Sequence, residues 1–125
     1  MPGKILVVED DADLHIGLAL RLTSHGYEVL SALDGEEAVD LCRQQRPDLV
    51  LMDIGLPGKD GHDVARQLST LPNMRDVPVV YLTARHEAQH RLEAAGIGAA
   101  AYLVKPTTTA KLFAAIGAAL PASQY

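Results

Sequence analysis

The sequence predicts one α/β domain in which helices cover both faces of a parallel sheet of five strands. Short apolar runs alternate with longer segments of helical periodicity along the chain. In the first run, residues 5–8, the apolar residues are continuous, which is typical of a strand buried on both faces. The length of 125 residues also suits one domain. We assign residues 1–120 to this domain and residues 121–125 to a C-terminal tail or the start of a linker.

The first strand and helix have well-marked limits. Residues 5–8 form the apolar run of the strand, and the helix that follows contains leucines at helical spacing. These leucines are Leu14, Leu18 and Leu22. Gly26 is a suitable end for the helix, because glycine readily adopts the left-handed conformation found just after many helices. Asp11 precedes the helix, and we expect it to cap the helix rather than to bind a ligand.

The second and third pairs of strand and helix follow in the same order. Residues 27–32 predict a strand, and residues 34–37 resemble a capping box that opens a helix ending before Pro47. Residues 49–52 form the third apolar run. Residues 55–61 contain three glycines and one proline, which predicts a loop. The inner face of the next helix should consist of Val64, Ala65 and Leu68.

The last two pairs complete the pattern. The fourth strand is predicted at residues 77–82, with Pro78 near its start, where proline is tolerated. A fourth helix is predicted at residues 87–95 and a fifth strand at residues 101–104. The last helix is predicted at residues 111–120, and three threonines before it can supply its cap. These are Thr107, Thr108 and Thr109.

Composition and charge argue against several classes of protein. A net charge of −5 disfavours nucleic-acid binding by this domain, because contact with phosphates requires a basic face. No apolar run is long enough to span a membrane, and the N-terminus lacks the layout of a signal peptide. The single cysteine, Cys42, excludes an internal disulfide, and its apolar surroundings favour a place in the core. We therefore expect a cytoplasmic protein.

Polar residues suited to phosphoryl chemistry follow four of the five apolar runs. They are Glu9 and Asp10 after the first, Asp53 after the third, Thr83 after the fourth and Lys105 after the fifth. Ligands of open parallel α/β sheets bind beyond the carboxyl ends of the strands, so these side chains should meet at one edge. One acid after one strand is commonplace, but such a set at four strand ends rarely arises by chance.

The residue types in this set indicate a particular chemistry. Glu9, Asp10 and Asp53 would crowd carboxylates together, and a divalent cation would relieve their repulsion. Oxygen ligands of small size suit Mg²⁺. A carboxylate can act as a nucleophile and form an acyl phosphate. Lys105 and Thr83 could then hold the oxygens of the transferred phosphoryl group.

Four segments resemble the receiver domain of bacterial two-component response regulators. They are residues 5–11 (ILVVEDD), 51–61 (LMDIGLPGKDG), 82–84 (LTA) and 102–106 (YLVKP). The resemblance extends from Lys4 to about Leu120. It implies a CheY-like, flavodoxin-like (βα)5 fold with strand order 2-1-3-4-5.

The resemblance also implies a role for each residue at the acidic edge. Asp53 is similar in position to the phosphoacceptor of the family. Asp10 and Asp53 would bind Mg²⁺ directly, Gly55 would bind it through its backbone carbonyl, and Glu9 would bind it through water. Gly55 and Arg85 occupy the positions that tune how water reaches the acyl phosphate in this family.

Further implied roles concern the response to phosphorylation. Lys105 would bind the phosphoryl group, and its peptide bond to Pro106 is expected to be cis. Thr83 and Tyr102 resemble the switch pair, in which the threonine moves toward the phosphoryl group and the tyrosine ring turns inward. The donor would be the phosphohistidine of a sensor histidine kinase or of a histidine phosphotransfer protein. The surface that changes for a downstream effector would include the fourth helix, the fifth strand and the fifth helix.

The stretch before Tyr102 departs from one branch of the family. Receivers that dimerise as transcription factors usually carry acidic residues where this chain has Ala100 and Ala101, so their salt-bridged dimer is not expected here. The small residues 98–101 could dock a protein partner or could serve ordinary helix–strand packing. His86 and His90 lie four residues apart without an evident third ligand, so we expect surface histidines rather than a metal site.

Other functions compete with that of a stand-alone switch. The domain could be a module of a hybrid histidine kinase or of a larger regulator. It could also be a degenerate receiver that only acts as a scaffold, but the intact set of residues at the strand ends argues against this. The set comprises Glu9, Asp10, Asp53, Thr83 and Lys105. A phosphatase of the haloacid-dehalogenase type would also use Asp, Thr, Lys and Mg²⁺. That family requires a second acid two residues after the nucleophile, where this chain has Gly55. We therefore expect no enzyme beyond one that catalyses its own phosphorylation and dephosphorylation.

Overall fold

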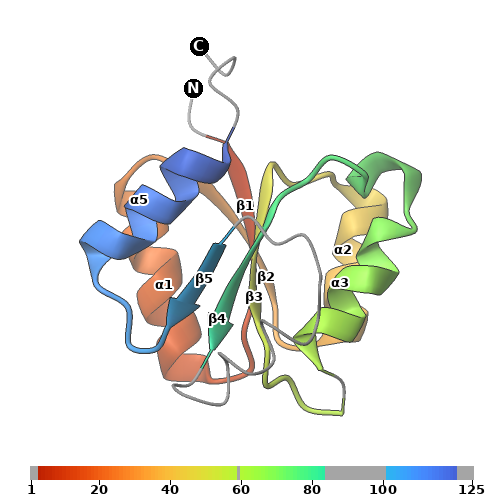
Figure 1. The fold of residues 1–125 in the computed structure, drawn as a ribbon, viewed down its shortest axis with the longest axis horizontal. Coiled ribbons are helices and arrows are strands. Elements are labelled where there is room, and N and C mark those ends of the chain that lie inside the picture. The colour runs from red at the N-terminus through yellow and green to blue at the C-terminus, as the bar shows by residue number, and fades with distance from the viewer. Residues whose placement is uncertain (1–2, 59, 84–100, 121–125) are drawn as a thin grey trace.

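Five parallel strands form one sheet in a computed structural model that describes residues 3–58, 60–83 and 101–120 (Figure 1). The strands are β1 (Lys4–Val8), β2 (Glu28–Ala32), β3 (Leu49–Asp53), β4 (Val79–Thr83) and β5 (Ala101–Val104). The helices among the described residues are α1 (Ala12–Ser24), α2 (Gly35–Gln44), α3 (Gly61–Ser69) and α5 (Thr109–Ala119), with a short 3₁₀ helix, η1 (Pro72–Met74). The strand order β2-β1-β3-β4-β5 confirms the predicted topology.

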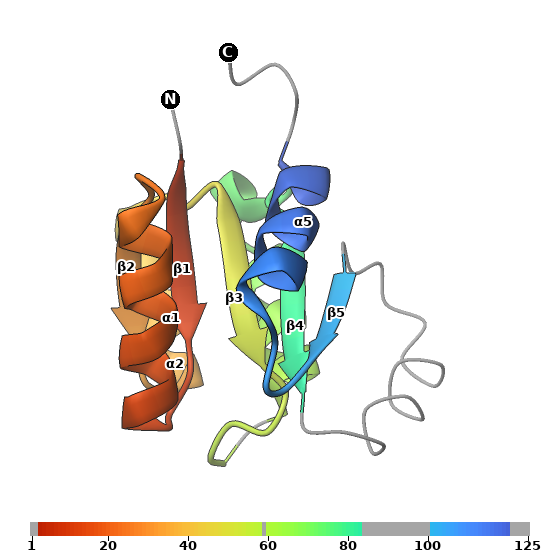
Figure 2. The same cartoon turned by 90° about the vertical axis from the view of Figure 1, so that its left-hand side faces the viewer.

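The sheet separates two apolar cores. Helices α1 and α5 pack on one face and α2 and α3 on the other (Figure 1). Side chains alternate between the faces, as strand geometry requires: in β1, Ile5 and Val7 join the core under α1 and α5, whereas Leu6 and Val8 join the core under α2 and α3. Figure 2 shows the strands in order with their carboxyl ends at one edge of the sheet. We call this edge the carboxyl edge.

Local capping chemistry explains where α1 begins and ends. Asp11 is the N-cap residue, and its side chain accepts a hydrogen bond from the N–H of Leu14, as predicted. Gly26 has a φ of 89°, the left-handed conformation that favours glycine, and it directly follows the C-cap residue His25. The first helix therefore has the limits that its sequence indicates.

Helices α2 and α5 use the predicted caps with small differences. Asp34 caps α2 by accepting from the N–H of Glu37, but the Glu37 carboxylate accepts from Leu33 N–H, one residue before the usual partner in a capping box. Thr108 caps α5 by accepting from the N–H of Lys111. That cap starts α5 two residues earlier than the expected limit of residues 111–120.

The fourth strand and its surroundings differ most from expectation. It occupies Val79–Thr83 rather than residues 77–82, because Pro78 stands outside the strand and supplies only its carbonyl, which accepts from the N–H of Val50. The short helix η1 was not predicted. The predicted fourth helix, together with Arg85, His86, His90 and Ala100, lies outside the described residues. In the described part of the chain, no helix is sufficiently long and apolar to cross a membrane.

Candidate phosphoacceptor and metal site

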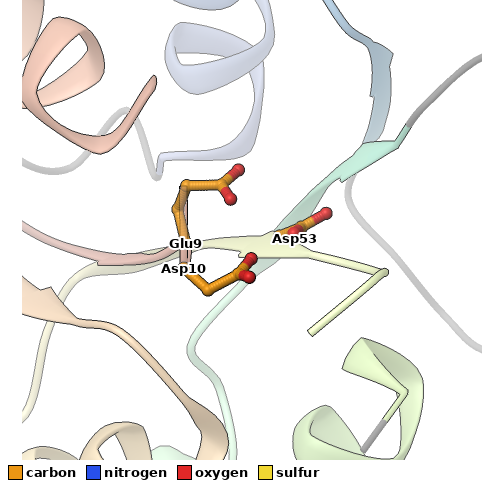
Figure 3. Close-up of side chains that lie close together, drawn as sticks. All are labelled: Glu9, Asp10 and Asp53. Carbon is orange, nitrogen blue, oxygen red and sulfur yellow. The ribbon is translucent and has the colours of Figure 1, made fainter. Parts of the chain in front are cut away.

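The three predicted carboxylates meet at the carboxyl edge. Glu9 and Asp10 directly follow β1, Asp53 ends β3, and β1 and β3 are neighbours in the sheet. One carboxylate oxygen from each residue lies within 4.8 Å of the others. In Figure 3, Glu9 and Asp10 extend from the end of β1 toward the side on which Asp53 lies. Glu9 and Asp53 are buried, whereas Asp10 is exposed and opens the cluster to solvent.

Lys105 supplies a positive charge to this cluster. Its Nζ lies 2.7 Å from Glu9 Oε1 and 3.0 Å from Asp53 Oδ1, so one ammonium bridges two buried acids. The residue follows β5, and its backbone N–H donates to the carbonyl of Thr83 at the end of β4. The Lys105–Pro106 peptide bond is cis, as the resemblance implies. Three strands thus contribute to a single ion-pair cluster.

The protonation equilibria reflect the crowding of these charges. Burial raises the pKa of Glu9 and nearby Asp53 raises it further, while hydrogen bonds from Lys105 and from the Asp11 N–H offset only part of this effect. Burial lowers the pKa of Lys105, but its bonds to Glu9 and Asp53 outweigh burial and leave that pKa raised. Lys105 therefore stays cationic, and the three acids still outnumber the positive charge beside them.

The donor set fits a hard divalent cation such as Mg²⁺. Its side-chain donors are all carboxylate oxygens, and Asp10 keeps one side open to the water that Mg²⁺ retains. Asp10 and Asp53 would hold the ion, with Glu9 behind them. Among the residues that the structure describes, a side-chain Cβ added at Gly55 would have only Asp53 Oδ1 near it, at 4.0 Å. The backbone at Gly55 therefore leaves the approach to the cluster open.

Backbone contacts position Asp53 at the end of β3. Asp53 Oδ1 accepts from the N–H of Gly55 at 3.1 Å, and Ile54 N–H donates to the carbonyl of Leu82 in β4. Gly61 N–H donates to the Ile54 carbonyl at 2.8 Å, which closes the loop between β3 and α3. A Cβ at Gly61 would collide with the carbonyl oxygen of Asp53 and lie 2.8 Å from Ile54 Cα. Only glycine allows α3 to begin this close to the acceptor.

A buried histidine also supports the acidic turn after β1. His15 Nδ1 lies 2.9 Å from the backbone carbonyl of Glu9, and Glu9 Oε2 accepts from the N–H of Asp11. These bonds pin the Glu9 main chain and side chain to the start of α1. His15 could not be predicted to have this role from the sequence, because a single histidine on a helix face carries no pattern of its own.

Of the two predicted switch residues, Thr83 lies on the strand next to Asp53 and Tyr102 lies one strand further away. Thr83 is buried at the end of β4, where the register pairs Asp53 with Leu82 and Thr83 with Val104. The Tyr102 ring stacks on Tyr81 of the neighbouring strand, with 5.0 Å between ring centroids and 20° between ring planes. The two tyrosines are direct partners in the register of β4 and β5.

Two further residues of this region were not predicted as functional. His62, in the first turn of α3, is buried with its ring centroid 4.7 Å from that of Tyr81, and its Nε2 lies 3.5 Å from the Tyr102 hydroxyl. Burial raises the pKa of Tyr81 to about 12. We call His62, Tyr81 and Tyr102 the aromatic cluster. The alternation of residues along β4 and β5 could have placed the two tyrosines on one face of the sheet, but it could predict neither their contact nor the histidine.

A family model described as the response regulator receiver domain matches residues 5–117. The chain belongs to this family. Among curated relatives, response regulator MprA of Mycolicibacterium vanbaalenii is 41% identical over 120 residues, which cover 96% of this chain and 51% of the relative. The chain spans about half the length of the curated relatives it matches, with coverage of 47% to 56% for several of them.

Solved structures show the same receiver fold. Chemotaxis protein CheY4 of Vibrio cholerae has a TM-score of 0.88 and 26% identity, with coverage of 96% of this chain and 100% of that one. The receiver domain of sensor histidine kinase PA1611 from Pseudomonas aeruginosa has a TM-score of 0.81 and 36% identity, with coverage of 91% and 93%. That structure has a magnesium ion coordinated in its active-site cleft. Such receivers thus occur both in regulators and in histidine kinases.

Proposed function

We propose that this receiver domain is a phosphorylation-dependent switch with Asp53 as the phosphoacceptor and Mg²⁺ as its cofactor. The observation that carries the proposal is the bridging of Asp53 and Glu9 by Lys105, beside an exposed Asp10, at the carboxyl edge. This arrangement combines a nucleophile, a cation-binding acid pair and a fixed ammonium, which are the groups that phosphoryl transfer from a phosphohistidine requires.

The chemistry at Asp53 is a nucleophilic displacement. A carboxylate oxygen of Asp53 attacks the phosphorus of the donor phosphohistidine, the P–N bond breaks, and the imidazole nitrogen leaves with the electron pair and takes up a proton. Asp10 and Asp53 would hold Mg²⁺, which would supply positive charge to the phosphoryl oxygens. Lys105, which holds Asp53 Oδ1 at 3.0 Å, shifts to a phosphoryl oxygen as the acid loses its charge. Thr83 offers a hydroxyl to another of these oxygens.

The test is reaction with a small phosphodonor. Incubation with acetyl phosphate and Mg²⁺ should add one phosphoryl group, measured by intact mass, and Asp53→Asn should add none. Asp48→Asn is the matched control, because it makes the same substitution at an acid that bonds Lys4 N–H away from the carboxyl edge. Continued hydrolysis of a small phosphoester over many turnovers would instead favour the phosphatase alternative, which lacks its second acid here.

Substitution of Gly55 provides a second test of the chemistry at Asp53. A larger, charged side chain at this position would enter the space beside Asp53 Oδ1 that glycine leaves open. We expect Gly55→Lys to change the lifetime of the acyl phosphate, measured from the decay of the phosphorylated mass. Equal lifetimes for the variant and the wild type would argue against a tuning role for Gly55. The matching prediction for Arg85 concerns a residue outside the described ranges.

The partners are proposed by class. A cytoplasmic histidine kinase or histidine phosphotransfer protein would donate the phosphoryl group, and an effector protein or domain would respond to the surface that includes β5 and α5. The curated relatives are about twice as long as this chain, and similar receivers occur within sensor kinases. The domain could therefore act within a larger regulator or a hybrid kinase. Phosphotransfer assays against candidate kinases, together with the coding sequence beyond residue 125, distinguish these contexts.

A further inference from the structure

Among the described residues, His62 makes a polar contact with the hydroxyl of Tyr102, and that contact has no place in the phosphoryl chemistry above. We propose that His62 is a positioning residue that holds the Tyr102 ring inward and thereby sets how readily the domain adopts its phosphorylated conformation. The inward position of the Tyr102 ring is a property of the unmodified protein. Its effect on the phosphorylated conformation rests on the proposed function of Asp53.

Asp60 determines how the His62 ring presents itself. The Asp60 carboxylate caps α3 by accepting from the N–H of His62, and the same oxygen, Oδ1, lies 3.0 Å from His62 Nδ1. A carboxylate can only accept, so Nδ1 must carry a proton. In the neutral imidazole the lone pair is then on Nε2, the atom that faces Tyr102. The Tyr102 hydroxyl is therefore the donor, and His62 is the acceptor.

Packing keeps the imidazole in this orientation. His62 is only 4% exposed, and its ring is tilted by 51° against Tyr81 with 4.7 Å between centroids. Tyr102 stacks on the other ring of the aromatic cluster, Tyr81, and is itself only partly buried. His62 and Tyr81 are thus both buried, and Tyr102 is the member of the aromatic cluster that has room to turn outward.

The start of α3 connects His62 and Tyr81 to the main chain of Asp53. His62 follows Gly61, whose N–H bonds the carbonyl of Ile54 and whose Cα approaches the Asp53 main chain too closely for any Cβ. A shift of the main chain after Asp53 must therefore move the first turn of α3 or break this contact. Because His62 is in that turn, its Nε2 is tied to the position of the acceptor strand.

The length of the contact suits a switch. At 3.5 Å, the distance between Tyr102 Oη and His62 Nε2 is at the outer limit of a hydrogen bond. A short bond would lock the ring, whereas a long one biases the two ring positions by a modest factor. An ordinary hydrogen bond changes such a ratio by roughly fivefold. His62 thus adjusts the balance between inward and outward rings rather than fixing it.

The experiment observes Tyr102 directly in the unmodified protein. The chain has four tyrosines and no tryptophan, so 3-fluorotyrosine labelling should give four ¹⁹F resonances that Tyr→Phe variants assign. His62→Phe keeps a ring beside Tyr81 but removes the acceptor. We expect the Tyr102 resonance to move toward its solvent-exposed position, with a decrease of roughly fivefold in the ratio of inward to outward rings. An unchanged Tyr102 resonance overturns the proposal.

Two controls separate the polar contact from packing. His62→Gln places an amide oxygen near the position of Nε2 and should keep most of the wild-type ring ratio. If Gln releases Tyr102 as fully as Phe does, the acceptor has no role and the proposal is wrong. In the Tyr102→Phe background, His62→Phe should have no further effect on the rate of phosphorylation, because the contact is already absent.

A measurement on wild-type protein covers the case in which His62→Phe does not fold. The ¹⁵N shifts of the His62 imidazole should show a proton on Nδ1, and Tyr102→Phe should shift Nε2. Protonation of Nε2 alone, or no response to Tyr102→Phe, contradicts the proposed contact. For the functional half, His62→Phe should slow phosphorylation by acetyl phosphate by no more than about fivefold. If even the wild type is not phosphorylated, the function proposed for Asp53 fails, while the ¹⁹F result still decides the role of His62.

Discussion

The two ends of the strands differ in how their acidic and basic side chains are paired. At the amino edge, where the strands begin, Lys4 pairs with Glu28 at 3.8 Å and Arg46 with Asp48 at 3.9 Å. Each acid there has its own base and is open to water. At the carboxyl edge, Lys105 serves two buried acids, Glu9 and Asp53, beside a third acid.

This difference separates charges that stabilise the fold from charges held for function. Exposed pairs cost little to form and contribute little, whereas buried carboxylates lose hydration that one lysine only partly replaces. Selection for folding alone would not gather excess buried acid at one edge. The contrast therefore indicates that the carboxyl edge is held at a cost in stability, and substitutions at both edges can test this interpretation.

The largest expected effect concerns backbone rather than charge. In Gly61→Ala the new Cβ meets the main chain of Asp53 and Ile54, which cannot rotate away. We expect a loss of about 3 kcal/mol in the free energy of unfolding, measured by urea titration. In Gly3→Ala, at the amino edge, the three atoms nearest to the new Cβ all belong to the Asp48 side chain, which can move. This variant should lose no more than about 1 kcal/mol in the free energy of unfolding.

A matched control uses a glycine with open surroundings. A Cβ at Gly117, in α5, meets no atom of the described residues within 4 Å outside the neighbouring helix backbone. Gly117→Ala should therefore add about 0.5–1 kcal/mol to the free energy of unfolding by favouring the helix. If Gly61→Ala were tolerated as well as Gly3→Ala, the close approach of α3 to the acceptor strand would not be essential.

The next effect tests the contrast in charge with one substitution at each edge. Asp53→Asn keeps an oxygen to accept from Gly55 N–H and relieves repulsion among the acids, so without Mg²⁺ it should stabilise the protein by about 1 kcal/mol. Asp48→Asn weakens the bond to Lys4 N–H and the pair with Arg46, and should cost about 1 kcal/mol. Urea unfolding in the presence of a chelator measures both. Equal losses at the two edges would refute the interpretation.

The carboxyl edge could be predicted in large part because it depends on local features of the sequence. The residues at the strand ends follow apolar runs, and parallel strands bring their carboxyl ends together whatever the loops between them do. Asp11 and Asp34 likewise follow from the hydrogen bonds that a helix start requires. Glu9, Asp53 and Lys105 therefore lie where the alternation of strands and helices places them.

The aromatic cluster could not be predicted in the same way. Contact between Tyr81 and Tyr102 depends on the exact register of β4 and β5, and the predicted fourth strand was displaced toward the N-terminus. The position of His62 depends on how closely Gly61 lets α3 approach the sheet. These are distances between segments far apart in the chain, and neither periodicity nor composition reports them.

A smaller effect should appear in the pH dependence of stability at the carboxyl edge. Burial raises the pKa of Glu9 above its ordinary 4.5, so the folded state binds this proton more readily than the unfolded state does. This contribution is complete below pH 4.5 and is lost as the pH rises through the raised pKa. The stability that comes from the raised pKa of Lys105 is constant below its ordinary pKa of 10.5 and is lost only at higher pH, so it does not vary in this range.

Metal-free wild type should therefore gain stability relative to Glu9→Gln as the pH falls from neutral toward 4.5. Urea unfolding of both proteins at a series of pH values measures the difference. A difference that does not vary with pH would mean that the Lys105 bond cancels the effect of burial on Glu9.

The smallest effect is expected at an exposed ion pair of the amino edge. Glu28→Gln removes the acid that faces Lys4, but the two side chains are 65% and 28% exposed and 3.8 Å apart. The Lys4 ammonium also keeps a bond to Gln45 Oε1 at 3.2 Å. We expect the free energy of unfolding to change by less than about 0.5 kcal/mol in urea titrations. A loss above about 1 kcal/mol in the free energy of unfolding would show that the stability of the amino edge also depends on particular charges. The excess of buried acid at the carboxyl edge would then no longer distinguish a functional edge from a structural one.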